Sequence, residues 1–254
     1  MISVEERLLS DIPCILLRQD EDSQCAHHYM VVYHGWTQSK ETALNLGYLF
    51  ARAGFDVVIP DVPQHGQRQT NAKISETAFV DNIVQAGHEF ASLYKTLNLT
   101  EEDEISVCGW SMGGIISSMI MAYYPNVQSA GILMGSPKLY QFIQHIVEHL
   151  PNTEAFEPMI QSEQFKEWIK PFDLDQQDHA LAERPVYLWH ARNDSVVPSK
   201  FTEAFIDEHA NEVTQSQIVY QVDEEGGHRV PFAIYHQLVA FLKSQSNILT
   251  FSDQ

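Results

Sequence analysis

The sequence is poor in cysteine and in basic residues. Its three cysteines, Cys14, Cys25 and Cys108, form no CxxC pair, so the chain predicts neither a disulfide framework nor a zinc ribbon. Lys and Arg together number 15 against 34 Asp and Glu, which gives a formal net charge of −19. A nucleic-acid or anionic-membrane partner is therefore disfavoured, because neutralising phosphate groups takes clustered Lys and Arg.

Long hydrophobic runs are also missing. No stretch reaches the roughly 18 consecutive apolar residues of a membrane-spanning helix, and the N-terminal MISVEERLLSDIPC lacks an apolar run of signal-peptide length. Together with the scarce cysteines, this predicts a soluble, cytoplasmic protein with no membrane partner. We find no HExxH motif and no other metal-ligand spacing, so neither a metal nor a cofactor is predicted.

What the sequence does have is an alternation of short β-branched runs with longer amphipathic ones. This pattern is typical of an α/β fold with a mostly parallel central sheet and helices on both faces. Helical spacing of apolar residues is clearest at 79–97 and 230–244. The expected strands are residues 14–19, 29–34, 56–60, 105–109, 130–135, 185–190 and 216–222.

One segment interrupts the alternation. Between the strands ending near residue 135 and starting near residue 185, the chain is far longer than the dozen or so residues that a crossover needs. Apolar stripes at helical spacing predict helices at 139–150 and 165–169, and Pro151, Pro158 and Pro171 favour several short ones. We therefore expect an α/β core of residues 1–136 and 183–254 with a helical cap insertion at 137–182.

The stretch SVCGWSMGGII, residues 106–116, contains the pentapeptide GWSMG with Ser111 at its centre. A strand candidate precedes it and an apolar run suited to a helix follows it. In this context G-x-S-x-G is typical of a sharp strand-to-helix turn that exposes a nucleophilic serine; the alternative is an ordinary glycine-rich turn. Gly109 and Gly113 would permit the turn, because a Cβ there would strike neighbouring backbone, and Gly114 would let the helix pack closely.

A nucleophilic serine needs a base and an acid that orients the base. His228, in GGHRVP between the last strand and the last helix, and Asp194, in LWHARNDSVVP just past a strand, meet both needs. Their chain order after Ser111 is that of one known triad scaffold. The acidic residues at 223–225 compete with Asp194, but they precede the histidine too closely to approach it from the opposite side.

Two backbone N–H groups are expected to form the oxyanion hole. One belongs to Met112, directly after the serine. The other belongs to Trp36 in YHGWTQSKET, because Gly35 would permit an unusual backbone that turns this N–H inward; Thr37 is the fallback. Trp36 and Trp110 would also wall an apolar substrate pocket, although plain packing explains tryptophans at such positions equally well.

Most of the 12 histidines must be bystanders. We interpret His34 as a structural partner of the oxyanion loop and His190 as a hydrogen-bonding residue at the end of a strand. His65 lies at another strand end near the expected site.

The motifs HGW, GFDVVIPDVPQHGQ, EISVCGWSMGG, LWHARNDSVVP and GGHRVP resemble, in order, those of the α/β-hydrolase superfamily. The resemblance is to small bacterial esterases related to prolyl oligopeptidases and dienelactone hydrolases. It implies Ser111 as nucleophile, Asp194 as acid, His228 as base, and a turn-stabilising role for Asp61.

A serine hydrolase of small to medium carboxylic esters is therefore expected, acting on small molecules without a cofactor. A thioesterase, an amidase or peptidase, or a cofactor-free perhydrolase could use the same triad. A non-catalytic binding protein on the same fold is the remaining alternative.

Overall fold

The computed structural model describes residues 1–19, 27–70, 77–150, 153–177, 181, 184–210 and 218–246. Cys25 and Pro151, both named above, lie outside these residues. Cys14 and Cys108 are buried free thiols. Within the described ranges, no helix is long and apolar enough to cross a membrane.

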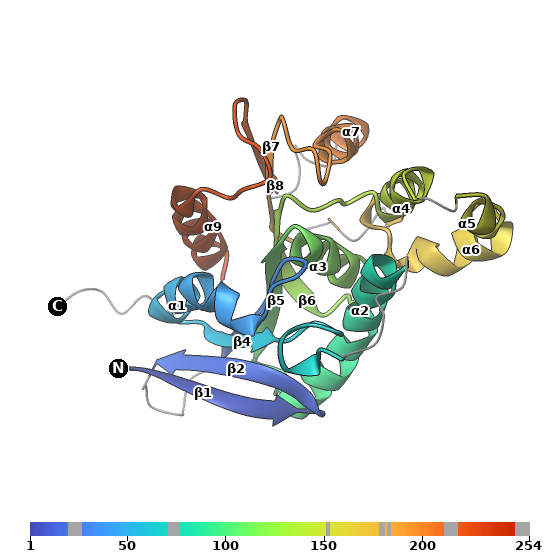
Figure 1. Cartoon of the computed structure of the whole chain (residues 1–254). Helices are drawn as coiled ribbons and strands as arrows, with labels where there is room; N and C mark the ends of the chain where they lie inside the picture. The colour runs from blue at the N-terminus through green and yellow to red at the C-terminus, as the bar shows by residue number, and fades with distance from the viewer. Residues whose placement is uncertain are drawn as a thin grey trace.

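Within the described residues, eight strands form one sheet in the order β1-β2-β4-β3-β5-β6-β7-β8 (Figure 1). The pairs β1–β2 and β2–β4 are antiparallel and every other pair is parallel, so the predicted mostly parallel sheet is confirmed. The strands are β1 Ile2–Leu9, β2 Ile12–Gln19, β3 His28–Tyr33, β4 Asp56–Pro60, β5 Glu104–Trp110, β6 Val127–Leu133, β7 Val186–Ala191 and β8 Ile218–Asp223.

The sequence patterns located seven of these strands and missed β1. This edge strand pairs with β2 from Ile2 opposite Gln19 to Leu9 opposite Ile12. Most of its side chains are exposed and only Ile2 and Val4 are β-branched, so it lacks the run of buried apolar residues by which the central strands were recognised. The hydrogen bonds to β2 hold it in the sheet, and composition gives little sign of them.

Helices cover both faces of the sheet, as predicted. Figure 1 shows α1 (Leu44–Arg52) and α9 (Phe232–Ser244) on one face, with α2 (Ala78–Leu97) and α3 (Met112–Tyr123) on the other. Each face has its own buried apolar cluster, and α7 (Lys200–Glu208) contributes to the cluster of α2 and α3. Short 3₁₀ turns lie at Lys40–Ala43, Gly66–Arg68, Lys170–Phe172 and Leu174–Gln176.

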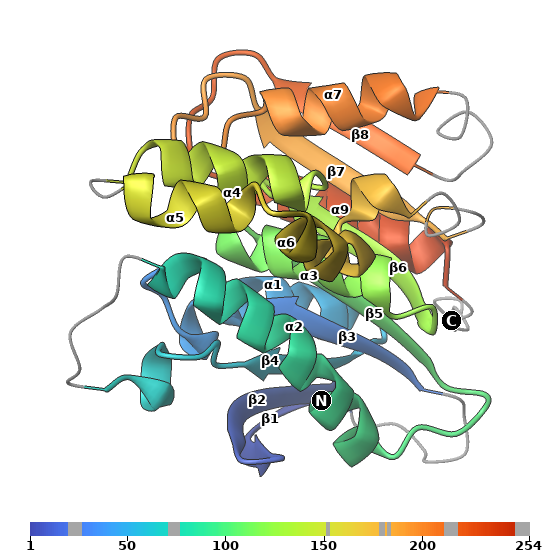
Figure 2. The same ribbon diagram turned by 90° about the vertical axis from the view of Figure 1, so that its right-hand side faces the viewer.

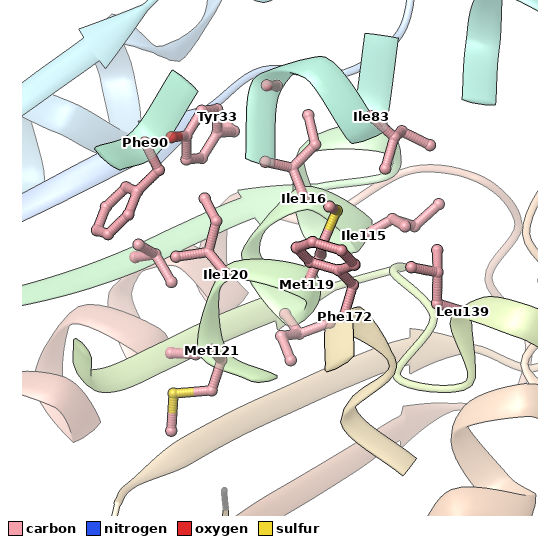
Figure 3. Packing of buried hydrophobic residues seen from close by; sticks show 14 of the residues in the cluster. Tyr33, Ile83, Phe90, Ile115, Ile116, Met119, Ile120, Met121, Leu139 and Phe172 are labelled. Carbon is pink, nitrogen blue, oxygen red and sulfur yellow. The ribbon is translucent and has the colours of Figure 1, made fainter. Parts of the chain in front are cut away.

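Apolar side chains of α3 form the centre of the larger cluster. Figure 3 shows Ile116 and Met119 packed with Ile83 of α2 and with Phe172, which lies in the segment between β6 and β7. All four are at most 5% exposed. Because α3 begins directly after Ser111, this packing fixes the helix that carries the predicted nucleophile at its start.

The described part of the segment between β6 and β7 contains the helices α4 (Leu139–Glu148), α5 (Thr153–Ile160) and α6 (Glu163–Ile169). They lie beside α2 and α3 in Figure 2, on the outer side of that layer. Several short helices were predicted, but Pro158 lies inside α5 and does not end it. The division into a core and a cap at residues 137–182 stays a prediction.

The start of α4 is held by a distant carboxylate. Asp173 is buried, and its Oδ1 and Oδ2 accept hydrogen bonds from the N–H groups of Leu139 and Tyr140, each at 2.9 Å. Burial raises the pKa of Asp173 to about 6, although these two donors oppose the shift. The contact ties the end of the insertion back to its beginning and so positions α4.

Candidate active site

Ser111 lies between β5 and α3 in a backbone conformation that L-residues rarely adopt, with φ 55° and ψ −122°. The turn needs its glycines: a Cβ on Gly113 would lie 2.1 Å from the carbonyl oxygen of Tyr33, and one on Gly109 would lie 2.5 Å from the backbone of Gly113. A Cβ on Gly114 would lie 2.8 Å from the carbonyl oxygen of Leu133. The expected steric roles of the three glycines are therefore confirmed.

The structure brings the three predicted polar residues into one hydrogen-bonded chain. Ser111 Oγ lies 2.9 Å from His228 Nε2, and His228 Nδ1 lies 2.9 and 2.8 Å from Asp194 Oδ1 and Oδ2. A carboxylate can only accept, so Nδ1 carries the imidazole proton and Nε2 is left to accept from the serine hydroxyl. The serine and histidine are 117 residues apart, and only the fold brings them together.

The Asp194 carboxylate is fully buried, and protein hydrogen-bond donors surround it in place of water. Its Oδ1 accepts from the N–H groups of Val196 at 2.9 Å and Val197 at 3.0 Å, and His190 Nε2 lies 3.5 Å from Oδ2. Burial would raise the pKa of Asp194, but the interactions with His190, His228 and the two N–H groups outweigh it and hold the pKa well below its usual range. The carboxylate is therefore charged at neutral pH.

His190 lies at the end of β7, as predicted. Its Nε2 donates to the carbonyl oxygen of Val197 at 2.7 Å, and its Nδ1 lies 3.2 Å from Thr202 Oγ1. The histidine thus fixes the loop that presents Asp194 and makes no contact with Ser111 among the described residues.

The competing acids at 223–225 are occupied elsewhere. Asp223 Oδ1 accepts from the N–H groups of Glu225 at 3.1 Å and Gly226 at 3.0 Å. Glu224 binds Arg192 through two contacts, at 2.9 and 3.0 Å. Glu225 is exposed. In the part of the chain that the structure describes, Asp194 is the carboxylate that reaches His228.

The two expected oxyanion donors lie at the first residue of α3 and in the loop after β3. Across the described residues, neither the N–H of Met112 nor that of Trp36 donates to a protein acceptor. The prediction that an unusual backbone at Gly35 turns the Trp36 N–H inward is wrong, because Gly35 has no positive φ. The residue of this loop with a positive φ is Thr37, at 60°. Gly35 is needed for space: a Cβ would lie 3.0 Å from the Trp110 Nε1 atom.

His34 holds this loop in place, as expected. Its Nδ1 donates to the carbonyl oxygen of Gly35 at 2.8 Å, and its Nε2 accepts from the N–H of Val62 at 3.1 Å. Burial lowers the pKa of His34 to about 4, which keeps the ring neutral. Asp61 also stabilises a turn, accepting from the N–H groups of Lys40 and Gln67, each at 2.9 Å.

A cavity of about 650 Å³ opens onto Ser111 and His228. Both tryptophans line it, as predicted: Trp110 is buried and donates to Gln38 at 3.1 Å, and Trp36 packs edge-to-face on His65 and Phe79. His65 Nδ1 donates to the carbonyl oxygen of Pro63 at 2.8 Å, and His65 is not among the residues that line the cavity.

Comparison with known proteins decides the family. The model of the alpha/beta hydrolase fold matches residues 29–158, more than half of the chain. YitV of Bacillus subtilis (strain 168), which bears the provisional name of an esterase, is 30% identical over 244 residues, covering 92% of this chain and 95% of that protein. The chain belongs to the α/β-hydrolase fold family.

Two further similarities agree with this membership. Esterase YjfP of Escherichia coli (strain K12) is 30% identical over 211 residues, which span 78% of this chain and 81% of YjfP. The crystal structure of TT1662 from Thermus thermophilus superposes with a TM-score of 0.70 at 17% identity, covering 96% of this chain and 98% of that one, and shows the shared fold. The narrower branch of esterases expected from the motifs stays a prediction.

Sequence reasoning missed part of the wall of this α/β-hydrolase cavity. Phe79 at the start of α2, and Phe142 and Ile146 of α4, line it together with Tyr235 of α9. The apolar stripe of α4 was recognised, but its spacing of four residues shows only that Phe142 and Ile146 share a helix face. Which cavity that face covers depends on where the insertion folds back, and no local pattern specifies this.

Proposed function

We propose that this chain is a serine hydrolase that cleaves carboxylic esters of small to medium acyl groups through an acyl-enzyme intermediate. That it is a carboxylic ester hydrolase follows from membership of the α/β-hydrolase family together with 30% identity to two esterases. The hydrogen-bonded chain Ser111–His228–Asp194 is the observation that carries the mechanism.

In the proposed acylation step, His228 Nε2 takes the Ser111 hydroxyl proton while Oγ attacks the ester carbonyl carbon. Asp194, charged at neutral pH, stabilises the imidazolium and keeps Nδ1 protonated. The tetrahedral intermediate collapses, His228 returns the proton to the departing alcohol, and the acyl group remains on Ser111. Water, deprotonated by His228, then attacks the acyl carbon; the bond to Ser111 Oγ breaks, His228 returns the proton to Oγ, and the carboxylic acid leaves. These steps require neither a metal nor an organic cofactor.

The N–H groups of Met112 and Trp36 are proposed to hold the oxyanion. Met112 stands at the N-terminus of the 12-residue helix α3, where the partial positive charge of the helix also favours an anion. Such donors stabilise the transition state without reorganising when charge develops. Removing one donor of this kind costs about 10²–10³-fold in kcat in a well-studied protease.

The limit on acyl size is proposed from two aromatic side chains. Phe79 and Phe142, with ring centroids 6.3 Å apart, line the cavity at Ser111. Their chain neighbours Val80 and Ile143 line a second, largely apolar cavity of about 650 Å³ between α2 and the insertion helices. The two rings therefore stand as a wall that ends the first cavity and confines the acyl group to it.

The test compares wild type with Ser111→Ala on p-nitrophenyl esters of increasing acyl length, and on thioester and amide analogues of the best acyl group. Ester turnover that peaks at short to medium chains and disappears in Ser111→Ala is expected. Wild-type turnover in Ser111→Ala would overturn the proposed nucleophile. Faster turnover of the thioester or the amide would assign the chain to a thioesterase or to an amidase or peptidase instead.

A further inference from the structure

The last turn of α4 and its C-cap carry three side chains that could ligate a metal ion: His145, Glu148 and His149. One potential ligand atom from each lies within 4.8 Å of the others. The sequence HIVEH has the spacing H-x-x-E-H, so the expectation that the chain has no metal-ligand spacing is wrong. In the described ranges, no other group of three such residues gathers in this way.

Helix geometry explains why the three converge. Residues three and four positions apart lie above one another on a helix, so a histidine at position i meets a glutamate at i+3 and a histidine at i+4. The imidazole rings of His145 and His149 have centroids 4.5 Å apart. His145 is half-buried, and Glu148 and His149 are exposed, so the cluster opens to solvent.

One of the rings is already oriented for ligation. His149 Nδ1 lies 2.7 Å from the backbone carbonyl oxygen of His145. A carbonyl can only accept, so Nδ1 bears the proton and Nε2 keeps its lone pair. Donation of the other ring N–H to a backbone carbonyl is the arrangement that fixes the tautomer and orientation of metal-ligating histidines.

We propose that His145, Glu148 and His149 form a site for a divalent transition-metal ion, with Zn²⁺ as the preferred physiological ion. Two imidazoles and one carboxylate leave the fourth tetrahedral position to water. Ligand atoms about 2.0–2.1 Å from a tetrahedral Zn²⁺ lie about 3.4 Å apart. The candidate atoms here lie within 4.8 Å of one another, and rotation of the exposed Glu148 and His149 side chains would close the difference. Imidazole ligands favour Zn²⁺, Ni²⁺ or Cu²⁺ over Mg²⁺ and Ca²⁺, which require oxygen ligands.

The surrounding charges act in both directions. The overall net charge of −19 attracts cations. Against this, Lys200 at the start of α7 places its ammonium 5.0 Å from the centroid of the Phe201 ring, and the His145 ring lies 5.5 Å from the same ring, so a positive charge stands near the cluster and opposes a bound cation. Replacing Lys200 with alanine is therefore expected to tighten metal binding.

The metal site is separate from the proposed catalytic centre, but α4 carries both the metal-ligand cluster and part of the wall of the catalytic cavity. Phe142 and Ile146 of α4 line the cavity at Ser111, whereas His145, Glu148 and His149 are not among its lining residues. A bound ion would join the last turn of α4 to its C-cap, His149. It would thereby rigidify the helix that covers the catalytic cavity.

Isothermal titration of the full chain with ZnCl₂ at pH 7.5 tests the site. Wild type is expected to bind one Zn²⁺ equivalent that Mg²⁺ does not compete for. His149→Ala and Glu148→Gln change exposed side chains. Each should weaken Zn²⁺ binding by at least about tenfold, since the loss of even an outer-shell partner lowers metal affinity by about 10–100-fold. Lys200→Ala should strengthen it.

Two histidine variants serve as controls. His236→Ala, at an exposed position of α9, and His228→Ala, in the proposed triad, should both retain the Zn²⁺ equivalent. Amide hydrogen exchange at residues 145–149 should slow on addition of Zn²⁺ in wild type and not in His149→Ala. Absence of binding, equal binding by His149→Ala, or loss of the equivalent in His228→Ala would overturn the proposal.

Discussion

His228 Nδ1 lies within hydrogen-bond distance of both carboxylate oxygens of Asp194, at 2.9 and 2.8 Å. The two residues follow the last two strands of the sheet, β7 and β8, which pair in parallel from Val186 opposite Ile218 to Ala191 opposite Asp223. Because both strands end at the same edge of the sheet, their loops meet there and bring acid and base together. Ser111 reaches the same edge at the end of β5.

Asp194→Asn should lower kcat by about 10³–10⁴-fold, because an amide can donate to Nδ1 and so favour the tautomer that cannot accept from Ser111. The matched control is Glu224→Gln, which changes a nearby carboxylate that binds Arg192. Steady-state kinetics on a short-chain aryl ester measure both. A large loss in Glu224→Gln with Asp194→Asn near wild type would exchange the roles of the two acids.

Gly113→Ala should destabilise the fold by more than about 3 kcal/mol, because its Cβ would lie 2.1 Å from the immobile carbonyl oxygen of Tyr33. Gly227→Ala is the matched control, since a Cβ there meets no atom within 4 Å, and it should stay within about 0.5 kcal/mol of wild type. Urea denaturation gives both free energies of unfolding. Equal stability of the two variants would contradict the steric account of the elbow.

Phe142→Ala should shift the preferred acyl chain to greater length, because it opens the wall between the cavity at Ser111 and the second apolar cavity. One methylene accommodated in an apolar pocket is worth about 10-fold or more in kcat/KM. Phe165→Ala, which alters the second cavity alone, is the control. The measurement is the ratio of kcat/KM for long over short p-nitrophenyl esters. If Phe142→Ala still cleaves short esters and this ratio is unchanged, Phe142 does not limit the acyl length, and the proposed ester hydrolysis still stands.

His34 should make the fold lose stability on mild acidification. Its pKa is about 4 in the folded protein and about 6.5 when unfolded, so between these values the unfolded state binds more protons. The stabilisation is complete above pH 6.5 and falls by about 3 kcal/mol as the pH drops to 4. The free energy of unfolding of His34→Gln, which does not titrate, should vary less over this range. Parallel curves for wild type and variant would refute the assignment.

The sequence predicted those parts of the molecule that local chemistry specifies. The turn at Ser111 could be predicted because its glycines, the preceding strand and the following helix are contiguous in the chain. Asp194 could be favoured over the acids at 223–225 because those acids precede His228 too closely in the chain to approach its ring from the opposite side. The edge strand β1 was not predicted, because its mostly exposed side chains give no alternation of buried and exposed residues. Backbone hydrogen bonds pair it with β2, and these are not visible in the sequence.

Features set by distant packing could not be predicted in the same way. The role of Phe142 as a wall depends on Phe79, which belongs to another helix. The positive φ in the loop after β3 belongs to Thr37 and not to Gly35, and the sequence HGWT alone does not indicate which of the two residues adopts it. The cluster at His145, by contrast, was legible from the spacing of HIVEH alone.

The nucleophilic role of Ser111 is tested most directly by labelling with a fluorophosphonate probe, followed by intact-mass and peptide analysis. One adduct per chain is expected on the peptide that contains Ser111, absent from Ser111→Ala and slowed at least about 10³-fold in His228→Ala, since the base activates the hydroxyl. An unlabelled wild type, as a non-catalytic binding protein would give, or an adduct that persists in Ser111→Ala, would contradict the account.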